Sequence, residues 1–189
     1  MENSLAHSLD LFPFISFYYF ALSNQQRVIL HTIGFELSID HPYTFLVEQI
    51  GKLVNGKKVE YKHPPSAPST TIMSKMKNEL TQYAMNFTND SMQTSLCLQF
   101  PPQQIAASMV YLSALFCKIQ PTGGKDWTEI LEHLGDVASF ASICLQVIEL
   151  LMDRKGAHKE TFDKIRLEIT KLRDNYAGEG PPAKRSRTN

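Results

Sequence analysis

The sequence is poor in cysteine, with three in 189 residues, and it carries no net charge. Cys97, Cys117 and Cys144 lie far apart, and their odd number argues against a disulfide framework or a closely spaced metal site. We expect all three to be small core residues in a reducing compartment. Nineteen basic residues balance nineteen acidic ones, so no strong field would attract the whole molecule to nucleic acid or to an acidic membrane.

Catalytic signatures are also scarce. The six histidines fall on separate segments, none of them at metal-ligand spacing, and Gly123-Gly124-Lys125 lacks the strand and upstream glycine of a phosphate-binding loop. Glu129, Glu132 and His133 could form an acid–base cluster, although a solvated helix face is the more ordinary interpretation. We therefore predict that the protein is not an enzyme and that it holds no metal and no other cofactor.

No apolar run is long enough to span a membrane, and we expect no membrane partner. Residues 11–22 are uncharged and aromatic, but Glu2 and Asp10 precede them and Pro13 interrupts them, which argues against a signal peptide. We treat residues 1–24 as an atypical hydrophobic segment. Two interpretations stay open: an ordinary hydrophobic helix that packs against the core, or the product of an alternative or mispredicted first exon.

The most apolar stretch runs from Pro101 to Ile119, and the rest of the chain is organised around it. Pro102 suits the first turn of a helix, where a backbone N–H is not needed. Large apolar residues recur at helical spacing on one face, and alanines keep the other faces thin enough for neighbouring helices to approach closely. We predict a central helix surrounded by protein. Its core face is formed by Ile105, Met109, Leu112 and Phe116.

Four further segments between residues 41 and 154 have helical periodicity. The first starts after Asp40-His41-Pro42, the second spans about 72–92, a short one carries Trp127, and the last spans 136–153. Between the first two, residues 55–71 contain several prolines, serines and threonines, which predicts a Pro-rich loop. The predicted fold class is therefore all-α, a five-helix bundle around the buried central helix.

Residues 155–177 differ in character, with alternating charges and an apolar stripe at a three-four spacing, which predicts a charged amphipathic helix. Packing of this stripe on the domain is the favoured interpretation, and a helix that binds a partner is the alternative. The stripe consists of Phe162, Ile165, Ile169 and Leu172.

The carboxyl end, residues 178–189, has the composition of a disordered basic tail. Lys184, Arg185 and Arg187 follow a pair of prolines and match a short nuclear import signal. This pattern predicts a nuclear location.

A series of short segments has the order of one protein family. In chain order they are Arg27-Val28-Ile29-Leu30, Thr32 to Tyr43, Asn86 to Ser91, Thr94 to Pro102, Ile105-Ala106-Ala107 and Tyr111-Leu112. They resemble the transcriptional cyclins, particularly cyclins T and K, from the end of the first cyclin box onward. The resemblance covers residues 25–154 and divides them into an inter-box linker (25–40) and a second cyclin box (41–154). Asp126-Trp127 stands where the family usually has paired tryptophans, so one partner is missing.

The resemblance implies a regulatory subunit that binds and activates a cyclin-dependent kinase of the elongation class, which phosphorylates the tail of RNA polymerase II. In that family the first box makes most of the kinase contact. We expect this chain to be truncated and to lack that box, so its kinase binding would be weak. The alternative is a helical adaptor that binds a protein without activating a kinase.

A third interpretation is a DNA-binding protein of cyclin-box fold. It requires a basic face, and the predicted helices offer only Lys75, Lys77 and Lys118. We expect no direct contact with nucleic acid.

Overall fold

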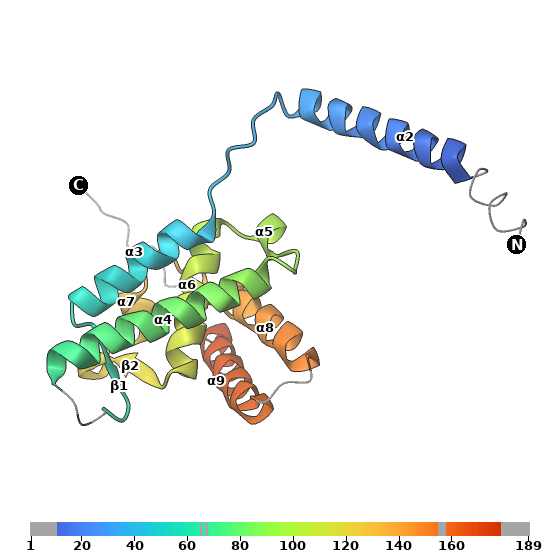
Figure 1. Ribbon diagram of the computed structural model, residues 1–189. Helices are drawn as coiled ribbons and strands as arrows, with labels where there is room; N and C mark the ends of the chain where they lie inside the picture. Colours follow the sequence, from blue (N-terminus) through green and yellow to red (C-terminus); the bar gives the residue numbers. More distant parts are fainter. Residues whose placement is uncertain (1–10, 65, 67, 155–157, 179–189) are drawn as a thin grey trace, which may run out of the picture. The chain divides into compact units, whose positions relative to one another are not determined.

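The computed structural model describes residues 11–64, 66, 68–154 and 158–178 (Figure 1). The chain divides into two compact units, Met1–Asp40 and His41–Asn189. In the described part of the first unit there is one helix, α2 (Leu11–Thr32). No helix among the described residues combines the length and the apolar character that a membrane crossing requires.

Helix α2 continues across the boundary predicted at residue 24 and into the predicted linker, and it ends close to Gly34. Gly34 takes a left-handed φ of 62°, and the N–H of Phe35 donates to the carbonyl of Leu30 over 2.9 Å. Large apolar side chains from Phe17 to Ile33 are exposed along this helix, Tyr19 by 73%. A helix of this kind has little buried face of its own. The origin of residues 1–24 in an alternative exon stays a hypothesis.

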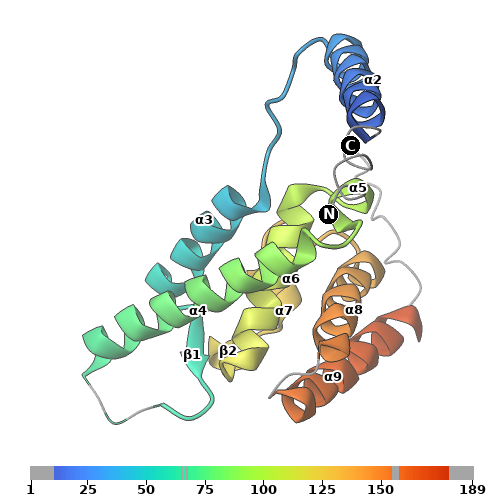
Figure 2. The ribbon, with the colours of Figure 1, turned by 45° about the vertical axis from the view of Figure 1, so that its right-hand side comes forward.

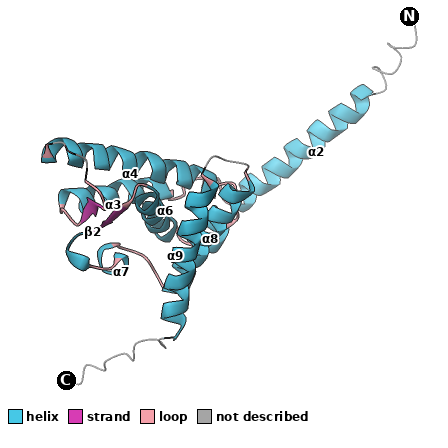
Figure 3. Cartoon of the chain, turned by 90° about the horizontal axis from the view of Figure 1, so that it is seen from below, coloured by secondary structure: helices cyan, strands magenta, loops and turns pink. Residues whose placement is uncertain are grey.

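The second unit is built around α6 (Pro102–Phe116), the predicted central helix. Every residue from Ile105 to Leu115 is buried, so this stretch has no solvated face. Figure 3 shows α6 nearly end-on, with the other helices of the unit around it. Ala106 and Ala114 are fully buried, which fits the close approach that thin faces allow.

Helices on several sides cover α6, and the predicted all-α fold is confirmed. Pro42 opens α3 with His41 at the N-cap, where the sequence predicts a helix start. Figure 2 shows α8 and α9 packed side by side. The helices are α3 (Pro42–Asn55), α4 (Ser69–Ser91), α7 (Trp127–Ile130), α8 (Val137–Asp153) and α9 (Lys159–Gly178).

Short elements are what the sequence analysis missed. The predicted Pro-rich loop contains a strand, β1 (Val59–Tyr61), which pairs antiparallel with β2 (Ile119–Pro121) directly after α6. Val59 and Ile119 are buried, so the pairing seals one end of the core. Three residues are too few to show a period-2 pattern. The sequence analysis also did not predict a four-residue helix, α5 (Leu96–Gln99), or a 3₁₀ turn (Thr122–Gly124), because each is too short to show a helical period.

The cysteines occupy different environments, so the expectation of three core residues is wrong in part. Cys144 is fully buried and Cys117 is half-buried, but Cys97 is exposed. The reason is the short helix α5, which turns Leu96 into the core and leaves the next side chain outside. All three are free thiols.

The start of α8 gives a first prediction. The Oδ2 atom of Asp136 accepts the backbone N–H of Ser139 over 2.9 Å, and hydrogen bonds from the Ser139 side chain and backbone lower the pKa of the Asp136 carboxyl. Asp136→Ala is expected to lower the free energy of unfolding by about 1 kcal/mol at neutral pH, because it removes the N-cap. Urea unfolding measures the change, and Asp136→Ser, which keeps a capping oxygen, should retain most of the stability.

The effect of Asp136 should depend on pH. Since its pKa is lowered in the folded state, the stabilisation is present above the unfolded pKa of about 3.9 and is lost as the pH falls through the folded value. The difference between wild type and Asp136→Ala should therefore shrink in acid. An equal difference at neutral pH and at about pH 2.5 would show that the carboxylate is not the capping group.

Candidate functional site

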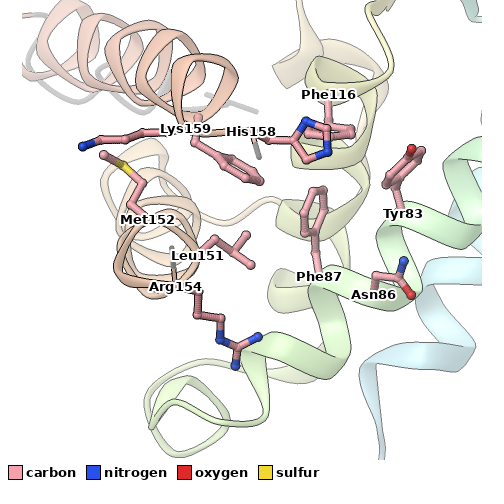
Figure 4. A pocket seen from close by; sticks show the side chains of 10 residues that line it. Tyr83, Asn86, Phe87, Phe116, Leu151, Met152, Arg154, His158 and Lys159 are labelled. Atoms are coloured by element: carbon pink, nitrogen blue, oxygen red, sulfur yellow. The ribbon is translucent and has the colours of Figure 1, made fainter. Parts of the chain in front are cut away.

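A groove opens on the second unit where α4, α6 and α8 meet the start of α9 (Figure 4). Its volume is about 550 Å³, within the usual range for ligand-binding clefts. Side chains from distant parts of the sequence form it, so it exists only in the folded domain. We name it the aromatic groove, after the rings that line it: Tyr83 and Phe87 of α4, Phe116 of α6, Phe162 of α9, and His158.

The rings of the aromatic groove pack on one another. Phe116 lies at their centre, with its ring centroid 4.8 Å from that of Tyr83, 6.0 Å from Phe87 and 5.7 Å from Phe162. The His158 ring is 5.3 Å from Phe116 in an edge-on arrangement. Each such pair adds about 0.5–1.5 kcal/mol beyond the burial of its area. The wall of the groove is therefore fixed before anything binds to it.

Exposure differs along this wall. Phe87 is buried, Phe116 and Phe162 are half-buried, and Tyr83 is 36% exposed. Leu151 and Met152, both half-buried, complete the apolar lining from α8. An apolar surface that is reachable from solvent and rich in aromatic and methionine side chains is typical of protein-binding sites.

The polar side chains of the groove are cationic or neutral. Figure 4 shows Arg154 and Lys159 on the same side of the groove as Leu151 and Met152, opposite Tyr83. Arg154 Nη1 lies 2.6 Å from Oδ1 of Asp90, and Nη2 donates to Oε1 of Gln93, so the charge of Arg154 is largely compensated within the domain. None of the described residues that line the groove is acidic.

A second polar cluster joins α3 to the segment after α7. The Nζ atom of Lys52 lies 2.7 Å from Oε2 of Glu132 and 2.9 Å from Oε1 of Glu48. The hydrogen bond to Glu132, followed by that to Glu48, raises the pKa of Lys52, and the same bond lowers the pKa of Glu132. Glu132 is thus occupied by a surface ion pair, which favours a structural role over acid–base chemistry. The predicted helix face is wrong, however, because α7 ends at Ile130 and both Glu132 and His133 lie beyond it.

The half-buried and buried thiols are not activated. Burial raises the pKa of Cys117 to about 12, and it raises the pKa of Cys144 as well. Both therefore stay protonated at neutral pH and are poor nucleophiles. Among the described residues there is no group of three or more His, Cys, Asp or Glu side chains that could hold a metal ion.

The structure separates the four residues predicted for the core face of the central helix. Ile105, Met109 and Leu112 are at most 2% exposed, within the core. Phe116, the last residue of α6, is half-buried and turns into the aromatic groove.

The predicted stripe on α9 lies against the domain itself. Ile165 and Ile169 are 5% and 0% exposed, and Phe162 and Leu172 pack against the same core while remaining partly exposed. In the structure the stripe packs on the domain, which was the favoured interpretation, and the side chains of Ile165 and Ile169 are covered by it. The basic residues predicted for nuclear import, Lys184, Arg185 and Arg187, lie outside the described residues.

A family comparison identifies this architecture. The family described as "Cyclin, C-terminal domain" matches residues 69–171, which is more than half of the chain. The chain belongs to this cyclin family. The match begins with α4 and extends through most of α9, past residue 154, where the sequence analysis ends the second cyclin box. The matched region thus includes Lys159 to Lys171 of α9, in agreement with the packing of this helix on the core.

Individual cyclins are similar to the chain. Cyclin-T1-3 of Oryza sativa subsp. japonica is 41% identical over 107 residues, 55% of this chain and 18% of that protein. Cyclin-T1-5 of Arabidopsis thaliana is 39% identical over 109 residues, 56% of this chain and 15% of that protein. Cyclin-K of Homo sapiens is 29% identical over 137 residues, 69% of this chain and 20% of that protein. The chain thus matches a fifth or less of each of these relatives, and the predicted likeness to cyclins T and K is confirmed.

The sequence analysis did not predict the aromatic groove of this cyclin domain. Tyr83 and Phe87 belong to the apolar face of α4, and Phe116 and Phe162 belong to the stripes of their own helices. Each pattern is explained locally by core packing. Only the tertiary contact between α4, α6 and α9 shows that the stripes leave a common opening. The one local signal was a tyrosine, a residue with a polar tip, on an otherwise apolar helix face.

Proposed function

We propose that this cyclin-domain protein is a regulatory subunit of a cyclin-dependent kinase of the elongation class, active in RNA polymerase II transcription. The observation that carries the proposal is the similarity to Cyclin-T1 and Cyclin-K proteins within the matched cyclin domain. Nuclear location is part of the proposal, with Lys184, Arg185 and Arg187 as the import signal. Direct binding of nucleic acid is not part of it.

The proposed role is regulatory and not enzymatic. The protonated thiols of Cys117 and Cys144 and the ion-paired Glu132 support it, because neither offers a nucleophile or a free acid–base pair. The regulatory role of such a domain lies in its surface, which a kinase would contact. We propose that the second cyclin box binds the kinase only weakly by itself, since in transcriptional cyclins the first box supplies most of the contact.

The test is a binding measurement combined with a kinase assay. The purified 189-residue chain is titrated onto an immobilised cyclin-dependent kinase of the elongation class, and phosphorylation of a polymerase-tail peptide is followed in parallel. We expect weak, saturable binding with a rise in phosphorylation, and an inactive variant of the kinase controls for contaminating activity. Absence of binding at concentrations near 1 mM would overturn the proposal.

The second candidate is an adaptor that binds protein without activating a kinase. The aromatic groove favours it, because this surface offers a docking site that does not depend on a kinase. In the same assay the adaptor would bind without any rise in phosphorylation of the polymerase-tail peptide.

A further inference from the structure

We propose that the aromatic groove binds a short acidic segment of another protein, one that inserts aromatic or aliphatic side chains between Tyr83, Phe116 and Phe162 and places carboxylates near Lys159 and Arg154. This inference is independent of the kinase role. It concerns a different kind of partner and stands on the geometry and the charges of the groove.

The shape of the groove determines the size of its occupant. About 550 Å³ accommodates a few large side chains and not a whole helical domain. The packed rings form a preorganised wall, so little side-chain entropy is lost when a partner binds. Tyr83, with its 36% exposure, offers an amphipathic side chain of the kind that dominates binding hot spots.

Charge complementarity determines the chemistry of the occupant. Lys159 is exposed and supplies most of the positive charge at the groove. Arg154 is bound to Asp90 and Gln93, but 45% of its side chain stays accessible. The acidic residues next to them in the sequence, Asp153 and Glu160, are exposed but do not line the groove. An apolar groove with cations on its edge favours a segment with Asp or Glu beside its anchoring side chains, whereas it repels a basic one.

Selection from a random peptide library tests this occupant. The full-length chain is the bait, and the selected peptides are synthesised and their Kd values are measured by fluorescence anisotropy. We expect peptides that combine aromatic or aliphatic residues with Asp or Glu, and affinity that weakens as salt is added. Tyr83→Glu should weaken binding at least about tenfold, because it places a like charge on the groove wall, and Lys159→Glu should weaken it about threefold to tenfold.

Two controls match these variants in charge change, at exposed side chains outside the groove. Leu98→Glu adds an acid at a side chain that is 87% exposed on α5, and Lys171→Glu reverses an exposed charge on α9 away from the groove lining. Both should bind the selected peptides as the wild type does. Thermal melts of all four variants check that they are folded.

Several results would overturn the proposal. They are the recovery of no peptide that binds more tightly than about 1 mM, the selection of basic or uncharged peptides, and equal losses in groove and control variants. Self-association of the chain that Tyr83→Glu abolishes would also overturn it, because a second copy would then be the occupant of the groove.

Discussion

Tyr111→Ala is expected to lower the free energy of unfolding by about 3–5 kcal/mol, the range for removal of a buried aromatic side chain. Tyr111 is 1% exposed in the middle of α6. Its ring centroid lies 5.7 Å from that of Trp127 on α7 and 5.0 Å from that of Phe140 on α8. Burial also raises the pKa of Tyr111, so the phenol stays neutral. Its removal would leave a cavity where three elements meet.

Trp127 provides the measurement for this prediction. It is the single tryptophan of the chain and packs edge-on to Tyr111, so its fluorescence during urea unfolding monitors the core directly. Tyr83→Ala is the control, because Tyr83 is 36% exposed and loses one ring contact, with Phe116, so its removal should cost about 1–2 kcal/mol. Small domains have about 5–15 kcal/mol of total stability, so Tyr111→Ala should leave the domain close to unfolding. If Tyr111→Ala and Tyr83→Ala lowered the free energy of unfolding by the same small amount, α6 would not be the centre of the core.

The central helix was predictable because its sequence is compatible only with a fully buried helix. A stretch in which every residue from Ile105 to Leu115 is apolar or small must be covered on all sides. The serines within it do not alter this, since Ser108 donates to the carbonyl of Gln104 and Ser113 to that of Val110. Helical side chains that satisfy themselves locally can be buried without a tertiary partner.

The strand pairing and the aromatic groove could not be predicted from the sequence, because both depend on tertiary contacts. The pairing of β1 with β2 joins Val59 to Pro121 across 62 positions of sequence, and no local pattern encodes it. The aromatic groove could not be predicted from the sequence for a related reason. A helical stripe reveals that a face is apolar but not whether the neighbouring elements close over it, and here Phe116 and Phe162 are covered only in part.

Helix α9 is the clearest case of this ambiguity. Its three-four spacing favours a helix that packs on its own domain, but it is also compatible with a helix that binds a partner. The structure places it against α8 and α6, and the family match reaches residue 171, well inside this helix. Its contribution to stability should therefore be that of a core element.

Ile169→Asp tests this role and is expected to lower the free energy of unfolding by about 3 kcal/mol or more. Ile169 is fully buried, so the variant loses the packing of an isoleucine and must also desolvate a carboxylate. Urea unfolding followed by Trp127 fluorescence gives the loss of stability, and hydrogen exchange should show faster exchange of the amides of α9.

Leu167→Asp is the matched control, since Leu167 lies two positions earlier on the same helix and is 56% exposed. It introduces the same charge at nearly the same place, and it should change the stability by no more than about 0.5–1 kcal/mol. A similar small loss for both variants would mean that the domain is complete without α9, and the stripe of Phe162, Ile165, Ile169 and Leu172 would then again be a candidate for binding a partner. A large loss for Ile169→Asp alone would make α9 one of the walls on which the aromatic groove depends, because Phe162 reaches the groove from this helix.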